Sequence, residues 1–305
     1  MPRNDREARI EVFEDTLSQC RHNERLKAAV KASLADQQLI LEEDVVAGLA
    51  SENRTACSAS GSEAAYPAGG DVYGEDARIV VSQKRTLEAA QGYKGQRVCV
   101  LNFASATNPG GGVTRGSSAQ EECLCRCSTL YPCISEKSAR AGFHDRHRRL
   151  LADGKMDVLY NDDCIYTPGV VVFKSDTGLP QTLPESQWYC VDVITCAAPN
   201  LRENPSNSMN PGSSSRAVKI KDSALAALHE KRADRILKIA KAHHAQVVIL
   251  GAFGCGAFQN PPAVVAAGIW EAVKRHRRDF AVIEFAVYCS PRDTGNYDAF
   301  RRRFQ

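Results

Sequence analysis

Short apolar runs and amphipathic stretches alternate along most of the chain. The apolar runs have the length and the β-branched content of buried strands, and they lie at residues 79–82, 98–103, 157–160, 164–167, 170–174, 188–198, 246–250 and 280–288. Apolar residues at helical spacing occupy the intervening residues 86–92, 119–131, 138–151, 217–244 and 261–277. Strands that alternate with helices in this way predict an α/β protein with a layered sheet.

The first 50 residues lack this alternation. Charged and apolar residues recur there at helical spacing, as in Ile10, Phe13 and Leu17, and they predict two or three amphipathic helices. Residues 57–71 are rich in Ser, Ala and Gly, which is typical of an exposed connection. We therefore expect a boundary there, between an N-terminal helical region and the α/β domain.

The composition fits a globular protein. Hydrophobic residues make up 43% of the 305 residues, enough for a sizeable core, and the net charge is only +3. Long blocks of one charge are few, so there is no direct nucleic-acid signal. The N-terminus lacks the apolar segment of a secretion signal, and no run approaches the roughly 20 apolar residues that span a bilayer. These features predict a soluble intracellular protein of the cytoplasm, with no membrane partner.

The 12 cysteines lie mostly within apolar runs, which favours reduced, buried thiols over disulfides. One dense cluster comprises Cys123, Cys125, Cys127 and Cys133, but its spacing is not the C-x₂-C spacing of a zinc site. We therefore expect no metal site there. Two histidine pairs lie on charged helical faces, and we expect them to be solvated: His144 with His147, and His243 with His244.

The most distinctive stretch follows the predicted strand 98–103. Three consecutive glycines, Gly110 to Gly112, must end regular structure, and a helix with two acids in its first turn begins soon afterwards. Ser117 or Ser118 is the expected N-cap. Glycine N–H groups and a helix N-terminus would then face one spot without partners, which predicts an anion site.

A second glycine loop, at residues 251–256, follows the predicted strand 246–250. Neither loop matches a nucleotide fingerprint, because G-x-x-x-x-G-K-S/T is absent and Gly254-x-Gly256 lacks the third glycine of G-x-G-x-x-G. One such loop alone would more often be a tight structural turn. Ligands of α/β sheets collect at the carboxyl ends of strands, so two loops at equivalent strand ends predict a diphosphate held between them.

The two acids, Glu121 and Glu122, have two interpretations. Acids in the first turn of a helix commonly only complement its dipole, which would also lower the pKa of Glu122. Their position directly after the glycine loop favours a chemical role. Neighbouring helical residues diverge by about 100°, so the carboxylates are not expected to flank one bond as in ordinary two-carboxylate glycosidases. We expect one acid to do the chemistry and the other to orient.

These motifs resemble a known family. Gly110-Gly-Gly112 followed by Gln120-Glu121-Glu122 resembles the signature of poly(ADP-ribose) glycohydrolases of the microbial type, over about residues 79–290. Supporting motifs are Leu101-Asn-Phe-Ala-Ser-Ala106, Ile165-Tyr-Thr-Pro-Gly-Val170, Asp192-Val-Ile-Thr-Cys-Ala-Ala-Pro-Asn200, and Gly251-Ala-Phe-Gly-Cys-Gly-Ala-Phe258 with Asn260-Pro-Pro262. The resemblance implies a macrodomain-like α/β/α fold with a mixed, largely parallel sheet at residues 76–305, and a helical accessory region at residues 1–75.

The resemblance also assigns roles at the first loop. Glu122 resembles the catalytic acid, and Glu121 the neighbour that holds the ribose. Asn108 would bind hydroxyls of the distal ribose, and the glycines Gly110, Gly111 and Gly112 would let the backbone pass close to that sugar. Gln120 would brace the loop.

Roles at the second loop follow in the same way. The resemblance assigns Gly254, Cys255, Gly256 and Ala257 to a diphosphate loop. Phe258 would be the aromatic residue that packs on the terminal ribose.

The activity implied is hydrolysis of the ribose–ribose bond of poly(ADP-ribose), with Glu122 as acid and then base and ADP-ribose as product. The partners would be poly(ADP-ribose) or ADP-ribosylated macromolecules, without cofactor or metal. Two alternatives stay open: a mono-ADP-ribosyl hydrolase of the same fold and a non-catalytic ADP-ribose-binding domain. A purely structural domain is disfavoured because two glycine loops cluster with Asn108 and Phe258.

Overall fold

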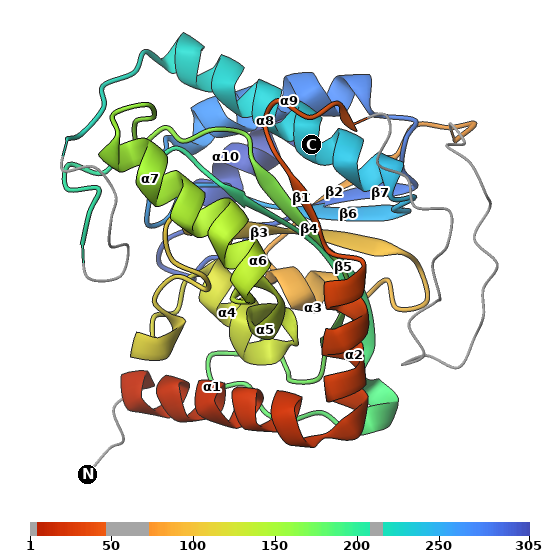
Figure 1. The fold of residues 1–305 in the computed structure, drawn as a ribbon. Coiled ribbons are helices and arrows are strands. Elements are labelled where there is room, and N and C mark those ends of the chain that lie inside the picture. The colour runs from red at the N-terminus through yellow and green to blue at the C-terminus, as the bar shows by residue number, and fades with distance from the viewer. Residues whose placement is uncertain (1–4, 47–72, 208–215) are drawn as a thin grey trace.

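A seven-stranded mixed sheet forms the centre of the computed structural model, which describes residues 5–46, 73–207 and 216–305 (Figure 1). The strands are β1 (Gln38–Ile40), β2 (Arg78–Ser82), β3 (Val98–Ala104), β4 (Cys164–Val172), β5 (Tyr189–Ala197), β6 (Val247–Leu250) and β7 (Val282–Ala286). Their order is β1-β4-β5-β3-β6-β7-β2. The five strands from β5 to β2 run parallel, and β4 is antiparallel to both its neighbours.

Helices cover both faces of this sheet. They are α1 (Asp5–His22), α2 (Glu24–Ala35), α3 (Thr86–Gln91), α4 (Gln120–Cys127), α5 (Leu130–Ile134), α6 (Lys137–Ala139), α7 (Arg146–Ala152), α8 (Asp222–Ala242), α9 (Pro262–Arg275) and α10 (Gly295–Phe304). Side chains of a strand alternate between its faces: Cys99 and Leu101 pack in the core under α8 and α9, and Val98 and Val100 in the core under α1 and α4. The predicted three-layer α/β/α fold is confirmed (Figure 1).

The N-terminal region differs from the prediction in one element. Two of the expected helices are α1 and α2, but the residues expected to begin a third form strand β1 on the edge of the sheet. Ile40 is fully buried there while Leu39 points outward, because neighbouring strand residues face opposite sides. Part of the region 1–75 thus belongs to the sheet. The division at residue 75 stays a prediction, and the Ser/Ala/Gly-rich stretch 57–71 lies outside the described residues.

Three predicted strand segments also change. Residues 164–167 and 170–172 belong to one strand, β4, whose register shifts between Thr167 and Val170. Gly169 takes a left-handed φ of +62° at this bulge and donates its N–H to Asp192. Pro168 and Gly169, which lie between the two predicted strands, therefore bend one strand instead of separating two. Residues 157–160 form turns and no strand.

The predicted helices have different ends. The helix expected at 119–131 is interrupted after Cys127, because Ser128 pairs with Val172 and the Thr129 N–H donates to the Val171 carbonyl. Helix α3 has Arg85 as its N-cap. Helix α10 was not predicted, although its Phe300 is fully buried against the sheet.

The expected solvation is wrong for three of the four histidines, whereas His244 is half-buried. His144 and His147 are buried beside Phe143, and His243 stacks on Tyr166 with ring centroids 3.6 Å apart. Apolar neighbours surround one side of each ring, so the charged residues around them in the sequence were misleading. Within the described ranges, no helix has both the length and the apolar character needed to cross a membrane.

The cysteines largely follow the prediction. Free, buried thiols are Cys20, Cys99, Cys123, Cys125, Cys127, Cys133, Cys164 and Cys196. Cys190 differs, because it is disulfide-bonded. Among the residues that the structure describes, no three His, Cys, Asp or Glu side chains gather as metal ligands.

Candidate active site

Both glycine loops begin at the carboxyl ends of strands in the middle of the sheet. The first follows β3 and the second follows β6, and these strands are parallel neighbours, with Val98 opposite Val247 and Val100 opposite Ile249. Their carboxyl ends therefore lie side by side, where ligands of α/β sheets bind. Helix α4 begins at Gln120 with Ala119 as its N-cap, one residue later than predicted, and places both acids in its first turn.

The glycine N–H groups of the first loop are not free. The Gly112 N–H donates to Glu122 Oε1 at 2.9 Å, and the Gly110 backbone lies near enough to the Glu121 carboxylate to lower its pKa. The Gly111 N–H donates within the loop to Asn108. The expected anion site is thus occupied by the protein's own carboxylates, so this loop orients the acids instead of presenting empty donors.

The two acids approach the same point of the loop. Gly111 has a φ of +56°, and a Cβ atom there would lie 2.7 Å from Glu122 Oε1 and 3.1 Å from Glu121 Oε2. Although neighbouring helical residues diverge by about 100°, both side chains bend back to the same glycine. The expectation that the two carboxylates do not flank one bond stays a prediction. Only a residue without a side chain can lie between them.

The hydrogen bonds distinguish the two acids. Both oxygens of Glu121 accept hydrogen bonds, Oε1 from Asn102 Nδ2 at 3.3 Å and Oε2 from the Ser105 N–H at 2.8 Å. Glu122 is held only through Oε1, and its Oε2 accepts no hydrogen bond from any other residue in the described part of the chain. Glu121 is thus fixed at both oxygens, and Glu122 retains one oxygen for another partner.

Burial raises the pKa of both acids. Burial and then the charge of Glu122 raise the pKa of Glu121 well above its usual value, although hydrogen bonds from Ser105 and Asn102 oppose this. Burial likewise raises the pKa of Glu122, against the lowering effects of the Gly112 N–H and of Arg126. The expected net lowering by the helix dipole is therefore wrong: desolvation exceeds it in the protein without ligand.

Gln120 and Asn108 brace the site in this structure. Gln120 Oε1 accepts the Phe103 N–H, and Gln120 Nε2 donates to the Leu101 carbonyl and to Thr86. It therefore braces the end of strand β3, where a role on the first loop was expected. Asn108 Nδ2 donates to the Gly111 carbonyl, so its amide supports the glycine turn. Its predicted contact with ribose hydroxyls stays a prediction.

The second loop does carry free donors. No described residue accepts the N–H groups of Gly254, Gly256, Ala257 or Phe258, whereas the Cys255 N–H donates to the Ala252 carbonyl inside the loop. Gly254 has a φ of +80°, and a Cβ there would collide with Ala198 and Asn260. The anion site predicted between two loops is thus supported at this loop only, and the N–H of Cys255 contributes nothing to it.

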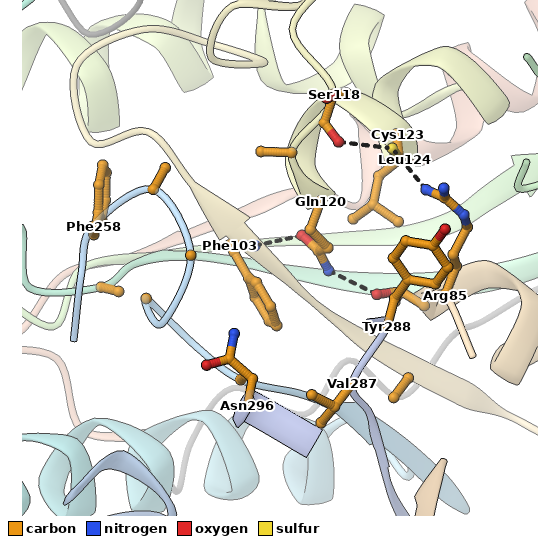
Figure 2. Close-up of a pocket in the computed structure, with 18 of the residues that line it drawn as sticks. Arg85, Phe103, Ser118, Gln120, Cys123, Leu124, Phe258, Val287, Tyr288 and Asn296 are labelled. Atoms are coloured by element: carbon orange, nitrogen blue, oxygen red, sulfur yellow. Dashed lines mark hydrogen bonds between the residues drawn. The ribbon is translucent and has the colours of Figure 1, made fainter. Parts of the chain in front are cut away.

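A cavity of about 280 Å³ lies at the carboxyl ends of the parallel strands (Figure 2). The second loop and Phe258 form one end, and Arg85 and Tyr288 form the other (Figure 2). Phe103 and Gln120 lie between these ends (Figure 2). Arg85 stacks on the Tyr288 ring, with its guanidinium carbon 4.0 Å from the ring centroid. An elongated ligand with a diphosphate near Gly256 would fit this shape.

A known enzyme family matches this chain. The model of the family described as "Microbial-type PARG, catalytic domain" matches residues 7–175, more than half of the chain. The chain belongs to this family. It is therefore an enzyme of a hydrolase family, and the family match begins within α1 and includes β1, so the N-terminal helices lie inside the matched region.

Solved structures give the same result. Poly(ADP-ribose) glycohydrolase from Thermomonospora curvata bound to the inhibitor ADP-HPD is 28% identical with a TM-score of 0.74, and the alignment covers 98% of this chain and 100% of that chain. The enzyme from Deinococcus radiodurans in complex with ADP-ribose is 29% identical with a TM-score of 0.66, over 90% and 96% of the two chains. Comparison with curated proteins gave no match.

Several cavity residues escaped the sequence analysis. Arg85 precedes α3, Tyr288 follows β7 and Asn296 lies at the start of α10. Arg85 and Tyr288 lie just beyond the carboxyl ends of strands β2 and β7. The rule that ligands collect at these ends could have found them if it had been applied to every strand and not only to those followed by glycines.

Proposed function

We propose that this chain hydrolyses the O-glycosidic ribose–ribose bonds of poly(ADP-ribose) and releases ADP-ribose, with Glu122 as general acid and then base. Membership of the family and the likeness to poly(ADP-ribose) glycohydrolases support the substrate. The observation that carries the assignment of Glu122 is its free oxygen. Both oxygens of Glu121 already accept hydrogen bonds from the protein, whereas Glu122 is anchored at Oε1 and open at Oε2.

The raised pKa of Glu122 suits the first step. A buried carboxyl with a raised pKa keeps its proton to a higher pH than an exposed one, and it can donate that proton to the departing ribose oxygen. The C–O bond to the distal ribose then breaks, and that ribose becomes an oxocarbenium-like cation. The new hydroxyl belongs to the shortened polymer.

The second step returns the proton. The Glu122 carboxylate accepts a proton from water, and the resulting hydroxide adds to the ribose cation, which yields ADP-ribose and restores the acid. Glu121, which is fixed at both oxygens, holds the ribose. One residue thus serves as acid and base in turn, and no metal is needed for either step.

Binding is assigned to the second loop. The free N–H groups of Gly256, Ala257 and Phe258 can donate to the diphosphate, as backbone donors do in other phosphate sites. Phe258 would lie against the terminal ribose. The cavity between Phe103 and Tyr288 would take the adenosine end of the ligand (Figure 2).

Glu122→Gln tests the proposal. The amide cannot donate the acid's proton, so we expect chain shortening of poly(ADP-ribose) to fall by about 10²–10⁴-fold, while calorimetry still detects binding of ADP-ribose. Glu14→Gln, an exposed change on α1, is the matched control and should remain active. Near-normal hydrolysis by the Glu122 variant would overturn the mechanism. A wild-type protein that releases single ADP-ribose units from protein but leaves the polymer intact would overturn the substrate.

A further inference from the structure

Helix α1 contacts the end of the first glycine loop, although the two lie far apart in the sequence. Arg6 Nε donates to the Arg115 carbonyl at 2.6 Å, and Arg9 Nε donates to the Gly116 carbonyl at 2.7 Å. Gly116 has a φ of +71°, and a Cβ there would collide with the carbonyl of Arg6. The backbone of the loop therefore lies directly on the backbone of α1.

An aromatic pair makes a second connection. Phe13 of α1 is 2% exposed and packs edge-to-face on Tyr131 of α5, with ring centroids 4.8 Å apart and an interplanar angle of 85°. Tyr131 in turn lies against Gly110, where a Cβ would be only 2.7 Å from Tyr131 Cδ2. The ring edge thus fills the space that a side chain at Gly110 would need.

These contacts lead directly to the two acids. The backbone of Gly110 lies beside the Glu121 carboxylate and lowers its pKa, and the Gly112 N–H donates to Glu122. A displacement of Gly110 would therefore move the backbone against which both carboxylates are oriented. Helix α1 also holds α4 itself, because Thr16 Oγ1 donates to the Arg126 carbonyl at 2.6 Å, one turn after Glu122.

We propose that α1 is a positioning element for the reaction, in which Phe13, acting through Tyr131, holds Gly110 to Gly112 closed against Glu121 and Glu122. Neither aromatic residue lines the cavity of Figure 2, and neither does Glu121 or Glu122, so the positioning role rests on the contact of Tyr131 with Gly110. Phe13 and Tyr131 are thus positioning residues, which act on the acids through the loop. The inference rests on the proposed function for its kinetic consequences, but the closed loop itself does not.

A closed loop has a pH signature. Burial is the largest cause of the raised pKa of both acids, and the other titratable groups around them are Arg126, Cys125 and Tyr131. If the loop opens, water reaches Glu122 and its pKa falls. Because the reaction needs protonated Glu122, the alkaline limb of the pH–rate profile should then move to lower pH.

The experiment compares four variants of the full chain. Phe13→Ala and Tyr131→Leu remove the ring contact, and Tyr131→Phe keeps the ring without the hydroxyl. Leu26→Ala is the matched control: Leu26 is fully buried in α2 and packs in a different cluster, with Phe173 and Trp188. Leu26→Ala should lower the free energy of unfolding by about as much as Phe13→Ala, without a contact to the glycine loop.

Three readouts decide the inference. We expect Phe13→Ala and Tyr131→Leu to lower kcat by about 10- to 100-fold with little change in KM, to move the alkaline limb to lower pH, and to speed amide exchange at Gly112. Tyr131→Phe and Leu26→Ala should do none of these. Equal losses in Leu26→Ala, or unchanged kcat and exchange in Phe13→Ala, would overturn the inference. Amide exchange needs no turnover, so it tests the closed loop even if the proposed function fails.

Discussion

At the scale of single residues, Gly111 is the position where the two acids meet the backbone. An added Cβ would lie 2.7 Å from Glu122 Oε1, and the φ of +56° disfavours any other residue. We expect Gly111→Ala to cost about 1–2 kcal/mol of stability through its left-handed backbone and to lower kcat/KM by at least about 10²-fold, because the carboxylates must move. Steady-state kinetics and thermal unfolding measure both effects.

Gly178→Ala provides the comparison for this change. Gly178 is exposed, a Cβ there would meet no atom within 4 Å, and its backbone is not left-handed. It should fold and turn over like the wild type. A Gly111→Ala enzyme that matches Gly178→Ala in kcat/KM would show that the acids do not need the close approach to the loop.

The identity of the acids was readable from the sequence, but the difference between them was not. Their place after three glycines indicated chemistry, and the family resemblance favoured Glu122. The structure adds that Asn102 and Ser105 hold both oxygens of Glu121. No spacing rule predicts these partners, because Asn102 lies within β3 and Ser105 just beyond its end, and their contact with α4 depends on tertiary packing.

At the scale of elements, Arg232 fastens helix α8 to the sheet edge that carries the site. It is 1% exposed, donates to Asp162 Oδ1 at 2.8 Å and to the Ala197 carbonyl at the end of β5. Burial alone would raise the pKa of Asp162, but the charge and hydrogen bond of Arg232 outweigh it and lower that pKa. The pair therefore stabilises the fold above the usual carboxyl range and loses this contribution as pH falls through the lowered pKa.

Asp162→Asn measures how much this ion pair contributes to the free energy of unfolding. The change leaves Arg232 buried without its counter-charge, and we expect a loss of about 3–5 kcal/mol in the free energy of unfolding near pH 7, with a smaller loss at low pH. Glu185→Gln, which breaks the exposed bridge to Arg25, should cost no more than about 1 kcal/mol. Urea unfolding at several pH values measures both. Equal small losses in the two variants would contradict this account.

Element types were predictable where local pattern and tertiary packing agree. Strands β3, β5 and β6 are buried along nearly their whole length and mostly apolar, so their runs are unambiguous. Strand β1 was mistaken for helix because three residues are too short to show a period. The interruption between α4 and α5 escaped notice because its cause, pairing with β4, is remote in the sequence.

At the scale of the whole molecule, the candidate site contains buried carboxyl groups whose charged forms destabilise the fold. Burial raises the pKa of Glu121, Glu122 and Asp176, which means that the folded protein disfavours their charged forms more than the unfolded chain does. Such groups destabilise the fold at neutral pH. The sheet and the helices on both its faces must offset this cost, as is common where stability and activity compete.

Glu122→Gln, which should lower activity, should therefore also raise the stability of the fold above the unfolded carboxyl pKa. The raised pKa of Glu122 implies that the wild type is fully stabilised below the unfolded value of about 4.3 and loses stability as pH rises through the folded value. Gln keeps an oxygen for the Gly112 N–H and carries no charge, so it avoids this loss. We expect the variant to have the higher Tm at pH 8, by roughly 2–4 °C for each kcal/mol, and the difference to vanish toward pH 4. Glu14→Gln, at an exposed position, should show no such pH dependence. If Glu122→Gln raised Tm equally at pH 4 and pH 8, burial of the Glu122 charge would not be the cause of the difference.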